Sequence, residues 1–413
     1  MRFTRLSTSI ATVYKPSYKH ISRRQHTTSS PAAIYHDIWH NEAQPGDTVY
    51  VGMSGGVDSS VTAHLLQSKG LNVQGIFMRN WDTRDERGEC PSEKDWQDVQ
   101  RVCQKLDIKC HQVDLVKEYW SSVFSVALDD YARGCTPNPD ILCNKEIKFG
   151  VLLHEVTRRL GSADWFATGH YARTIRTARC ADAALCRGAD EKKDQSYYLS
   201  RVRSRALRRV VFPLGSLSKT KDVRRIAKYA GLHNADREES MGICFVGEKR
   251  RFDQFLAEYI PQTPGDIVAQ DGRKLGTHQG LFSKTVGQTA GIPGWQQKWY
   301  IYDKDIATNR MFAVQDRLHP LLYTNDIVAE SVHWISGSAP KGLETNDESG
   351  LDLTAQIRHM QQPQKCTVKR TSADSIHAVF ENAQFGVANG QYLVLYDGDH
   401  CLGSAVIKQT KPQ

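Results

Sequence analysis

Residues 49–60 constrain the fold of this chain more than any other stretch. A β-branched apolar run is followed by Ser-Gly-Gly-Val-Asp-Ser-Ser, and apolar residues then recur at helical spacing at Val61, Leu65 and Leu66. The pattern predicts a strand, a tight loop and a helix. Gly55 and Gly56 permit positive φ and a close approach of the backbone, so successive N–H groups can converge on an anion at the helix N-terminus.

The side chains of this loop favour phosphate binding over an ordinary glycine turn. Ser54, Ser59 and Ser60 add hydroxyl donors, and Asp58 offers a carboxylate either for a metal or for fixing the loop. The loop is not a Walker A motif, because that motif requires a Gly-Lys pair and the sequence contains none. Ser-Gly-Gly-x-Asp-Ser instead resembles the PP-loop of ATP pyrophosphatases, which release pyrophosphate and transfer AMP to an oxygen of the substrate. That resemblance implies adenylation.

Length and composition bound the remaining possibilities. A chain of 413 residues is too long for one compact core, so two or three domains are expected. The apolar content of 40% and the charged content of 24% are typical of globular proteins. No apolar run is long enough for a membrane helix. The ten cysteines form no Cys-x-x-Cys pair, so neither a protein-bound metal site nor a disulfide scaffold is predicted.

Two segments carry an excess of positive charge. Residues 1–36 hold six basic residues, many serines and threonines and no acid, which predicts an organellar transit peptide; a disordered basic tail is the alternative. Residues 201–251 hold fourteen basic residues against five acids. Such a block is often a solvated helix face. Because the rest of the chain after residue 36 is close to neutral, we favour a surface that binds a polyanion.

The order of predicted elements indicates the fold class. Strands predicted at 73–78, 108–113 and 163–168 alternate with helices at 96–106 and 119–131. Such alternation predicts an α/β domain with a doubly wound parallel sheet and ligands at the carboxyl ends of the strands. After Phe252, short β-rich segments with Gly and Pro turns predict a small central β-rich domain and a C-terminal β-barrel. The expected boundaries are 1–36, 46–252, 253–322 and 323–413.

Two cysteines stand in informative surroundings. Residues 138–149 read Asn-Pro-Asp-Ile-Leu-Cys-Asn-Lys-Glu-Ile-Lys-Phe and place Cys143 where we expect a helix to start. A helix N-terminus with lysines nearby lowers a thiol pKa, and Asp140 could act as a base or hold a substrate donor. A buried, inert cysteine is the alternative. Cys244 lies in Ser-Met-Gly-Ile-Cys-Phe-Val and alone reads as a core cysteine, so the two thiols matter only if the fold brings them together.

Several strings in a fixed order carry a family resemblance. After the PP-loop and residues 138–149 come Ala-Thr-Gly-His-Tyr at 167–171, Lys-Asp-Gln-Ser-Tyr-Tyr-Leu at 193–199, Gly-Ile-Cys-Phe at 242–245, and then Gly280 and Gly287-Gln288. Together they resemble the tRNA-specific 2-thiouridylase family, which places sulfur on C2 of the wobble uridine. The resemblance extends from about residue 46 to about residue 407. The basic leader makes a mitochondrial member the nearest match.

The resemblance implies a role for individual residues. An ATP site of the adenine nucleotide alpha hydrolase-like type, used with Mg²⁺, would comprise Gly52, Met53, Ser54, Gly55, Gly56, Val57, Asp58, Ser59, Met78 and Gly169. Contacts with the target base or the tRNA would come from Asn138, Pro139, Asp140, His170, Lys193, Asp194, Gln195, Arg358, His359 and Gln391. Cys143 would be the nucleophile, Cys244 the persulfide carrier and Asp140 a catalytic partner. The family usually has Arg-Tyr where this chain has Arg358-His359.

The reaction implied by the resemblance is ATP-dependent 2-thiolation of uridine 34 in mitochondrial tRNAs, in the matrix. AMP is transferred to the C2 oxygen, and sulfur then arrives from a cysteine persulfide, either directly or as hydrosulfide. The implied partners are the tRNA anticodon stem-loop, a cysteine desulfurase or sulfur-relay protein, and a reductant for a Cys143–Cys244 disulfide; no membrane is expected. No iron–sulfur cluster is expected either, because Asp140 stands where a cluster would need a further cysteine. An adenylating amidotransferase and an RNA-binding scaffold are the alternatives.

Overall fold

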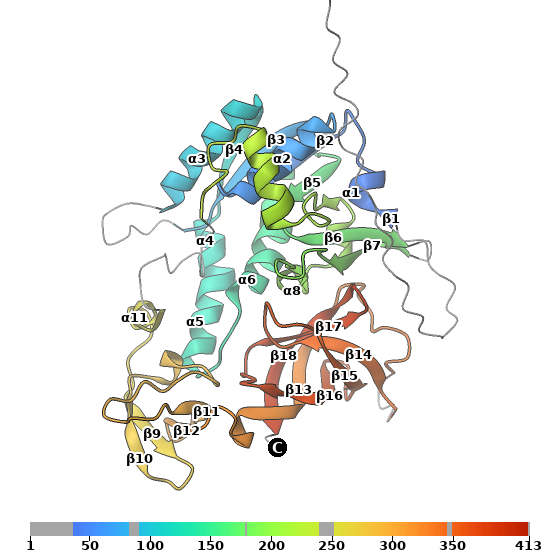
Figure 1. Cartoon of the computed structure of the whole chain (residues 1–413). Coiled ribbons are helices and arrows are strands. Elements are labelled where there is room, and N and C mark those ends of the chain that lie inside the picture. Colours follow the sequence, from blue (N-terminus) through green and yellow to red (C-terminus); the bar gives the residue numbers. More distant parts are fainter. Residues whose placement is uncertain (1–35, 82–90, 178–179, 239–251, 345–348, 412–413) are drawn as a thin grey trace, which may run out of the picture. The chain divides into compact units, whose positions relative to one another are not determined.

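A computed structural model of the chain describes residues 36–81, 91–177, 180–238, 252–344 and 349–411 (Figure 1). All of the predicted leader except its last residue lies outside the described residues. Cys244 also lies outside them. None of the helices in the described parts combines the length and the apolar character that crossing a bilayer requires.

The first half of the chain forms a five-stranded parallel sheet. Its strands are β2 (Thr48–Met53), β3 (Asn72–Arg79), β4 (Lys109–Asp114), β5 (Trp165–Thr168) and β8 (Val210–Val211), in the spatial order β4-β3-β2-β5-β8. The first of these strands, β2, lies in the middle and pairs in parallel with both β3 and β5. The predicted doubly wound α/β fold is therefore confirmed. The chain reverses its direction of winding between β2 and β5, where such sheets bind ligands at the carboxyl ends of the strands.

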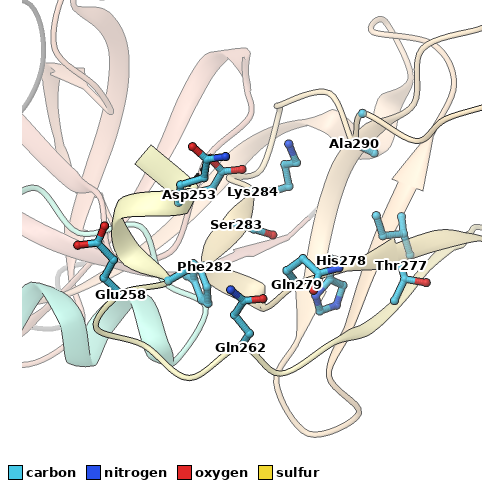
Figure 2. Close-up of a pocket in the computed structure, with 14 residues that line it drawn as sticks. Asp253, Glu258, Gln262, Thr277, His278, Gln279, Phe282, Ser283, Lys284 and Ala290 are labelled. Atoms are coloured by element: carbon cyan, nitrogen blue, oxygen red, sulfur yellow. Dashed lines mark hydrogen bonds between the residues drawn. The ribbon is translucent and has the colours of Figure 1, made fainter. Parts of the chain in front are cut away.

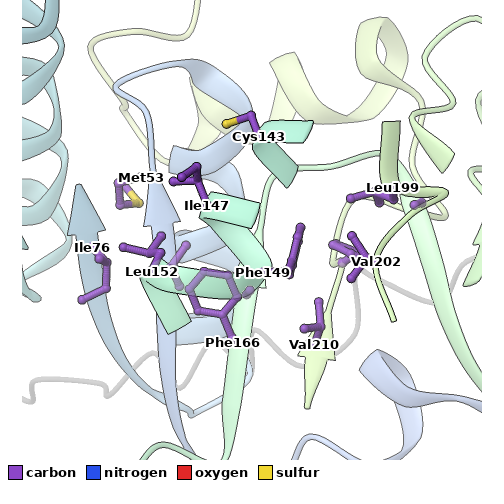
Figure 3. Close-up of a cluster of buried hydrophobic side chains, with 14 of the residues drawn as sticks. Met53, Ile76, Cys143, Ile147, Phe149, Leu152, Phe166, Leu199, Val202 and Val210 are labelled. Atoms are coloured by element: carbon purple, nitrogen blue, oxygen red, sulfur yellow. The ribbon is translucent and has the colours of Figure 1, made fainter. Parts of the chain in front are cut away.

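Helices connect and cover these strands. The connecting helices include α2 (Val57–Ser68) and α3 (Pro91–Leu106). Two longer helical stretches each contain a π-helical part: α4 (Val116–Tyr119), η2 (Trp120–Phe124) and α5 (Ser125–Ala132) form one, and α6 (Pro139–Leu142), η3 (Cys143–Val151) and α7 (Leu152–Leu160) form the other. The short α8 (Ser196–Leu199) and α9 (Ser204–Leu207) follow, and then η4 (Lys219–Val223) and α10 (Arg224–Tyr229). Figure 3 shows part of the buried core that the sheet shares with η3, including Ile76, Ile147 and Phe166.

A small β domain follows the α/β domain. After α11 (Phe252–Leu256) come β9 (Gly265–Ala269), β10 (Lys274–His278), the 3₁₀ turn η5 (Leu281–Ser283), β11 (Tyr300–Asp305) and β12 (Arg310–Val314). The four strands form one sheet in the order β10-β9-β12-β11. Ile267, Ile301 and Met311 are among the buried residues of its separate core. The predicted central β-rich domain is confirmed.

The C-terminal part closes into a six-stranded antiparallel barrel. After the 3₁₀ turn η6 (Pro320–Leu322), its strands are β13 (Tyr323–Trp334), β14 (Leu351–Gln356), β15 (Gln364–Arg370), β16 (Ser375–Phe385), β17 (Tyr392–Asp397) and β18 (His400–Lys411). They follow the order β18-β13-β16-β15-β14-β17, and a further β17–β18 pairing closes the ring. Alternate residues such as Val368, Ala378 and Leu393 fill the interior. The predicted barrel is confirmed.

A hairpin extends the barrel sheet into the α/β domain. Strands β6 (Ala172–Thr177) and β7 (Cys180–Arg187) pair antiparallel, and β7 pairs with β18 through His400 opposite Cys186. The short β1 (His36–Asp37), which precedes α1 (Ile38–Asn41), adds to the outer side of β6. The sequence predicted no strand in this hairpin. The structure shows that it belongs to a continuous sheet, which joins the α/β domain to the C-terminal barrel.

Candidate active site

The predicted phosphate loop has the expected strand–loop–helix geometry. Gly55 takes φ of +74°, and Gly56 is the N-cap of α2 without any side-chain capping bond. The Ser54 N–H donates to Ser59 Oγ at 3.1 Å, and Ser59 Oγ donates to the Gly56 carbonyl at 3.1 Å. The serines therefore brace the loop, while the first N–H groups of α2 remain available for an anion, which suits the phosphates of ATP.

At two glycines, neighbouring backbone comes so close that there is no room for a side chain. A Cβ atom on Gly55 would lie 2.8 Å from the Asp95 carbonyl oxygen. A Cβ atom on Gly169, just after β5, would lie 2.8 Å from the Ser59 nitrogen. The backbone after β5 thus packs directly against the N-terminus of α2. The two glycines thus let protein backbone pack closely around the loop and the N-terminus of α2, and this packed arrangement is the cradle of the loop.

Other predicted ATP residues lie on β2, on β3 and at the start of α2. The side chains of Met53 and Val57 are buried in the core, each 4% exposed. Gly52 lies against Thr168 of the neighbouring strand, with 3.3 Å between a Cβ at Gly52 and the Thr168 methyl carbon. Met78 is half-buried near the carboxyl end of β3, next to the loop-bearing strand β2. These positions agree with a nucleotide site at this edge of the sheet; the residue assignment itself stays a prediction.

Asp58 is engaged by a lysine that sequence reasoning did not single out. Lys219 Nζ lies 2.6 Å from both carboxylate oxygens of Asp58, and the Tyr171 hydroxyl donates to Asp58 Oδ1 at 2.8 Å. The Lys219 side chain is 3% exposed and that of Asp58 is 32% exposed. These contacts fit a role of Asp58 in fixing the loop, and its assignment to the ATP site stays a prediction. Nothing local in the sequence distinguishes Lys219 from the other cations around it.

Two further residues hold the loop from the side of α10. Asn234 Nδ2 donates to the Gly55 carbonyl at 2.8 Å and to Ser60 Oγ at 2.9 Å. Arg237 donates to the same Gly55 carbonyl at 3.2 Å and forms a 2.6 Å ion pair with Asp95 of α3. Burial raises the pKa of Asp95, and the Arg237 guanidinium opposes that rise. Sequence reasoning missed both residues, because neither lies near a recognisable motif.

The cations of the basic block at 201–251 divide into two groups in its described part. Four of its cations make contacts inside the fold: Arg201, Lys219, Arg224 and Arg237. The other described cations of the block are exposed, namely Arg203, Arg205, Arg208, Arg209, Lys221, Arg225 and Lys228. Counting charge along the sequence therefore overestimates the polyanion surface, because a count does not separate internal cations from exposed ones.

Cys143 lies inside a helix, whereas the sequence placed it at a helix start. The helix begins four residues earlier, at Pro139, and Asn138 caps it by accepting from the Ile141 N–H at 3.3 Å. Asn is a favoured N-cap and proline suits the first helical position, which explains the earlier start. Cys143 is 5% exposed and belongs to the same buried cluster as Met53, the last residue before the phosphate loop (Figure 3).

Asp140 sits one turn before Cys143 in a partly buried position. Burial raises the pKa of its carboxyl group, and the nearby Lys148 opposes the rise. The carboxylate in turn adds to the burial that raises the pKa of Tyr198 and of Tyr131. A carboxyl group with a raised pKa beside phenol groups is suited to exchanging a proton with a substrate.

His170 is held as a neutral ring. Its Nδ1 lies 2.7 Å from Thr168 Oγ1, and the ring packs near Phe149 and Phe212. Burial, together with the charge of Lys148, keeps the pKa of His170 well below its usual value. A neutral imidazole can donate or accept a hydrogen bond but offers no positive charge to a phosphate. The tRNA contact predicted for His170 stays a prediction.

The string at 193–199 joins the α/β domain to the barrel. The Tyr197 hydroxyl donates to the Tyr392 carbonyl at 3.0 Å, and Ser196 Oγ lies 3.2 Å from the Tyr396 hydroxyl. Gln195 accepts from the Tyr171 N–H at 3.0 Å. Part of this motif therefore positions the domains relative to each other within the folded unit.

Asp194 is turned into the fold. Its carboxylate is 6% exposed and accepts from the side chain of Arg187, the N–H of Gly188, and both the N–H and the hydroxyl of Ser196, at 2.9 to 3.1 Å. A direct contact of this carboxylate with tRNA, as predicted, finds no support in this geometry. Lys193 next to it is half-buried.

Two of the barrel residues predicted to contact tRNA also contact the α/β domain. Gln391 Nε2 donates to the Thr136 carbonyl at 2.7 Å, two residues before Asn138. The His359 ring lies 4.2 Å from that of Tyr198, centroid to centroid, and burial lowers the pKa of His359. Arg358 donates to the Phe385 carbonyl within the barrel. Gln391 thus contacts the segment that leads to Asp140 and Cys143, whereas His359 contacts Tyr198 of α8.

Comparison with known proteins explains this constellation. Domain models match residues 47–248 (tRNA methyl transferase HUP domain), 253–315 (tRNA methyl transferase PRC-barrel domain) and 324–407 (Aminomethyltransferase beta-barrel domain). The tRNA-specific 2-thiouridylase MnmA of Bacillus subtilis is 44% identical over 369 residues, which cover 89% of this chain and 96% of the relative. The chain belongs to the tRNA-specific 2-thiouridylase family.

Other relatives agree with that assignment. The tRNA-specific 2-thiouridylase MnmA of Escherichia coli is 42% identical over 370 residues, covering 88% of this chain and 97% of the relative. Among solved structures, a U34-tRNA thiolase of Methanococcus maripaludis with its [4Fe-4S] cluster covers 52% of this chain at 14% identity and a TM-score of 0.30. The match covers 66% of the thiolase chain. Because the likeness is so distant, we infer nothing about this protein from it. The domain names mention methyl transfer, but the near full-length relatives are thiouridylases, and so this chain is a sulfurtransferase.

This thiouridylase also has a hollow away from the predicted site. A cavity of about 480 Å³ lies between the α11 region and the central sheet, lined among others by Asp253, Glu258, His278 and Lys284 (Figure 2). His278 accepts from the Gly280 N–H at 3.1 Å and lies 3.2 Å from the Asn309 carbonyl, so both ring nitrogens serve the fold. None of the predicted site residues that the structure describes lines this hollow. Within the described residues, no cluster of His, Cys, Asp or Glu is arranged to hold a metal ion.

Proposed function

We propose that this chain catalyses the ATP-dependent 2-thiolation of uridine 34 in mitochondrial tRNAs. The observation that carries the proposal is the arrangement at the carboxyl edge of the parallel sheet. Cys143 and Met53, the residue directly before the phosphate loop, both belong to the extended core of the α/β domain (Figure 3), and Asp140 lies one turn before Cys143. Adenylation and sulfur transfer need these groups close together, because both act on the C2 position of one base.

The first step is the activation of the base. The C2 oxygen of uridine is a poor leaving group, and transfer of AMP to it makes a good one. The N–H groups at the start of α2, braced by Ser54 and Ser59, bind the phosphates of ATP. Mg²⁺, when bound, supplies further positive charge for the departing pyrophosphate. Asn138, Pro139 and Asp140 contact the base, and the raised pKa of Asp140 suits an exchange of a proton with it.

The second step is the delivery of sulfur. A cysteine desulfurase or sulfur-relay protein loads a persulfide on Cys244, which lies outside the described residues. In one route the terminal sulfur of the persulfide attacks C2 and expels AMP, and the Cys143 thiolate then attacks the Cys244 sulfur, which breaks the S–S bond and leaves the transferred sulfur on C2. In the other route the Cys143 thiolate first attacks the Cys244 sulfur and releases hydrosulfide, which then attacks C2 and expels AMP. Both routes expel AMP and leave a Cys143–Cys244 disulfide, which an external reductant must reopen. The proposal requires no iron–sulfur cluster.

The tRNA partner and the compartment follow from separate observations. The barrel residue Gln391 contacts Thr136, just before the helix of Asp140 and Cys143, and the barrel residue His359 contacts Tyr198 of the α/β domain. A tRNA anticodon loop bound at this edge would therefore contact both domains. The acid-free, basic leader at 1–36 supports import into the mitochondrial matrix.

Two cysteine variants test the proposal. We expect Cys143→Ser and Cys244→Ser each to abolish thiolation of tRNA, measured by mass spectrometry of wobble nucleosides, while ATP still binds. Cys366→Ser is the matched control, because Cys366 is buried inside the barrel, away from the site. Full thiolation by either active-site variant would contradict the two-cysteine scheme. Unchanged 2-thiouridine in organellar tRNA from cells that lack the protein would contradict the proposed function.

A further inference from the structure

The phosphate loop of this protein lacks a lysine of its own. Walker loops place a lysine on the β and γ phosphates, but residues 52–60 contain none. Backbone N–H groups at a helix N-terminus supply only about half a unit charge, whereas a nucleoside triphosphate carries several negative charges. The ATP site of the proposed function therefore calls for a cation from another part of the chain.

The structure places such a cation at the start of α2. Asp58 is the second residue of that helix, and Lys219 Nζ lies 2.6 Å from each of its carboxylate oxygens. The ammonium group therefore lies at the helix end whose N–H groups point toward a bound anion. Lys219 comes from η4, a stretch 161 residues further along the chain.

Several contacts hold the lysine in this position. Its backbone N–H donates to Asp190 Oδ2 at 3.0 Å. The Tyr171 hydroxyl donates to Asp58 Oδ1 at 2.8 Å, and Lys219 Nζ lies 5.8 Å from the centroid of the Tyr171 ring. Tyr171 also follows the Gly169-His170 turn that packs on α2. Three elements therefore hold the ion pair in place: η4 carries Lys219, the turn after β5 leads to Tyr171, and α2 carries Asp58.

Stability alone does not account for this pair. Burying an ammonium group costs several kcal/mol, and apolar residues of similar volume commonly stabilise a fold as well as a buried ion pair does. Lys219 is 3% exposed, whereas the Asp58 carboxylate beside it is 32% exposed. The Asp58 carboxylate is therefore the more exposed member of the pair, and it lies in the first turn of α2.

We propose that Lys219 is the phosphate-binding lysine of this site and that Asp58 and Tyr171 are positioning residues that hold it. Lys219 contacts a phosphate group of the bound nucleoside triphosphate. Asp58 acts on Lys219 and is not a ligand of Mg²⁺. The inference rests on the ATP site of the proposed function and names the residue that supplies its cation.

Binding of ATP and of adenosine to the full chain, measured by calorimetry, tests the role of Lys219. We expect Lys219→Met to weaken ATP binding by about 10- to 100-fold, the usual effect of losing a charged hydrogen bond, and to change adenosine binding less than about twofold. The double variant Lys219→Met with Asp58→Asn removes both charges, so no buried carboxylate is left without its partner. It should show the same loss. Lys221→Met, at an exposed position of the same η4 stretch, is the matched control and should bind ATP like the natural chain.

A titration with Mg²⁺ tests the role of Asp58. We expect Asp58→Asn to leave the Mg²⁺ midpoint of ATP binding unchanged, whereas loss of a metal ligand would raise it. A raised midpoint, or a folded double variant that keeps the natural preference for ATP over adenosine, overturns the inference. Thermal unfolding of each variant establishes that it is folded. If the unmodified chain shows no preference for ATP over adenosine, the proposed function fails, and this result is distinct from failure of the Lys219 assignment.

Discussion

Gln391 of the barrel donates its side-chain amide to the carbonyl oxygen of Thr136, 2.7 Å away and 255 residues earlier in the chain. The Thr136 N–H in turn donates to the Asn389 carbonyl at 2.8 Å. Gly390 between them approaches so closely that a Cβ there would lie 3.0 Å from the Cβ of Cys135. The C-terminal barrel therefore holds the segment that leads into the helix of Asp140 and Cys143.

The Gln391 contact should matter for activity more than for stability. We expect Gln391→Ala to lower kcat/KM for tRNA thiolation by about fivefold, because one neutral hydrogen bond contributes about 1 kcal/mol. ATP binding should not change, since Gln391 touches no residue of the phosphate loop. The exposed Gln362 offers a matched control on the same barrel, and Gln362→Ala should behave like the natural enzyme. Equal activity of the two variants would show that this contact does not position the site.

Asn234 should support the shape of the phosphate loop. Asn234→Ala removes two hydrogen bonds, to the Gly55 carbonyl and to Ser60 Oγ, from a side chain that is 3% exposed. We expect a loss of about 1–3 kcal/mol in the free energy of unfolding, measured with denaturant, and weaker ATP binding. Asn389→Ala, at an exposed position, should change neither quantity. A variant of normal ATP affinity but lowered stability would limit Asn234 to a role in folding.

Alanine substitutions at two glycines with similar φ angles can distinguish backbone strain from a steric clash. Gly55 takes φ of +74° and Gly272 takes φ of +84°. A Cβ at Gly55 would meet the Asp95 carbonyl at 2.8 Å, whereas nothing lies within 4 Å of one at Gly272. Both Gly→Ala variants should lose about 1–2 kcal/mol through the left-handed backbone. Only Gly55→Ala should also lose ATP binding, measured by calorimetry, and normal binding by that variant would contradict the cradle described for the loop.

The raised pKa of Asp140 predicts a pH-dependent stability. A carboxyl group whose pKa is higher in the folded state costs nothing where it is protonated in both states, and its cost appears as pH rises through the raised value. We therefore expect Asp140→Asn to raise the Tm relative to the natural chain, and this gain should be larger at about pH 8 than at about pH 4. Thiolation should fall in the same variant.

A control variant distinguishes the effect of the raised pKa of Asp140 from the general effect of replacing a carboxylate by an amide. Asp129→Asn changes an exposed residue of α5 in the same way. If Asp140→Asn showed the larger gain in Tm at the acidic pH, the sign of the proposed effect would be wrong.

Local sequence patterns predicted much of the α/β domain. The expected strand at 73–78 is β3 (Asn72–Arg79), and the expected helix at 96–106 is the later part of α3 (Pro91–Leu106). Cys143 shows where the approach failed, since its helix begins at Pro139. The capping preference of Asn138 and the proline after it favoured the earlier start, and we gave both too little weight.

Contacts between distant residues could not be predicted in the same way. Lys219 was one of fourteen basic residues in its block, and only the fold shows that it faces Asp58. The β6–β7 hairpin was missed, and with it the sheet that joins β7 to β18. Cys244 and most of the predicted leader lie outside the described residues, so their proposed roles stay predictions.

By itself, the sequence determined the phosphate loop, the alternation of strands and helices, and the family. These depend on local properties, namely the freedom of glycine at positive φ and the period of apolar residues. The tertiary structure decided which side chains meet at the loop: Lys219 with Asp58, and Asn234 with Gly55. The reason is the strand order β4-β3-β2-β5-β8, which places elements that are far apart in the chain at one edge of the sheet. No local pattern encodes such distances, and so the loop could be predicted while the lysine beside it could not.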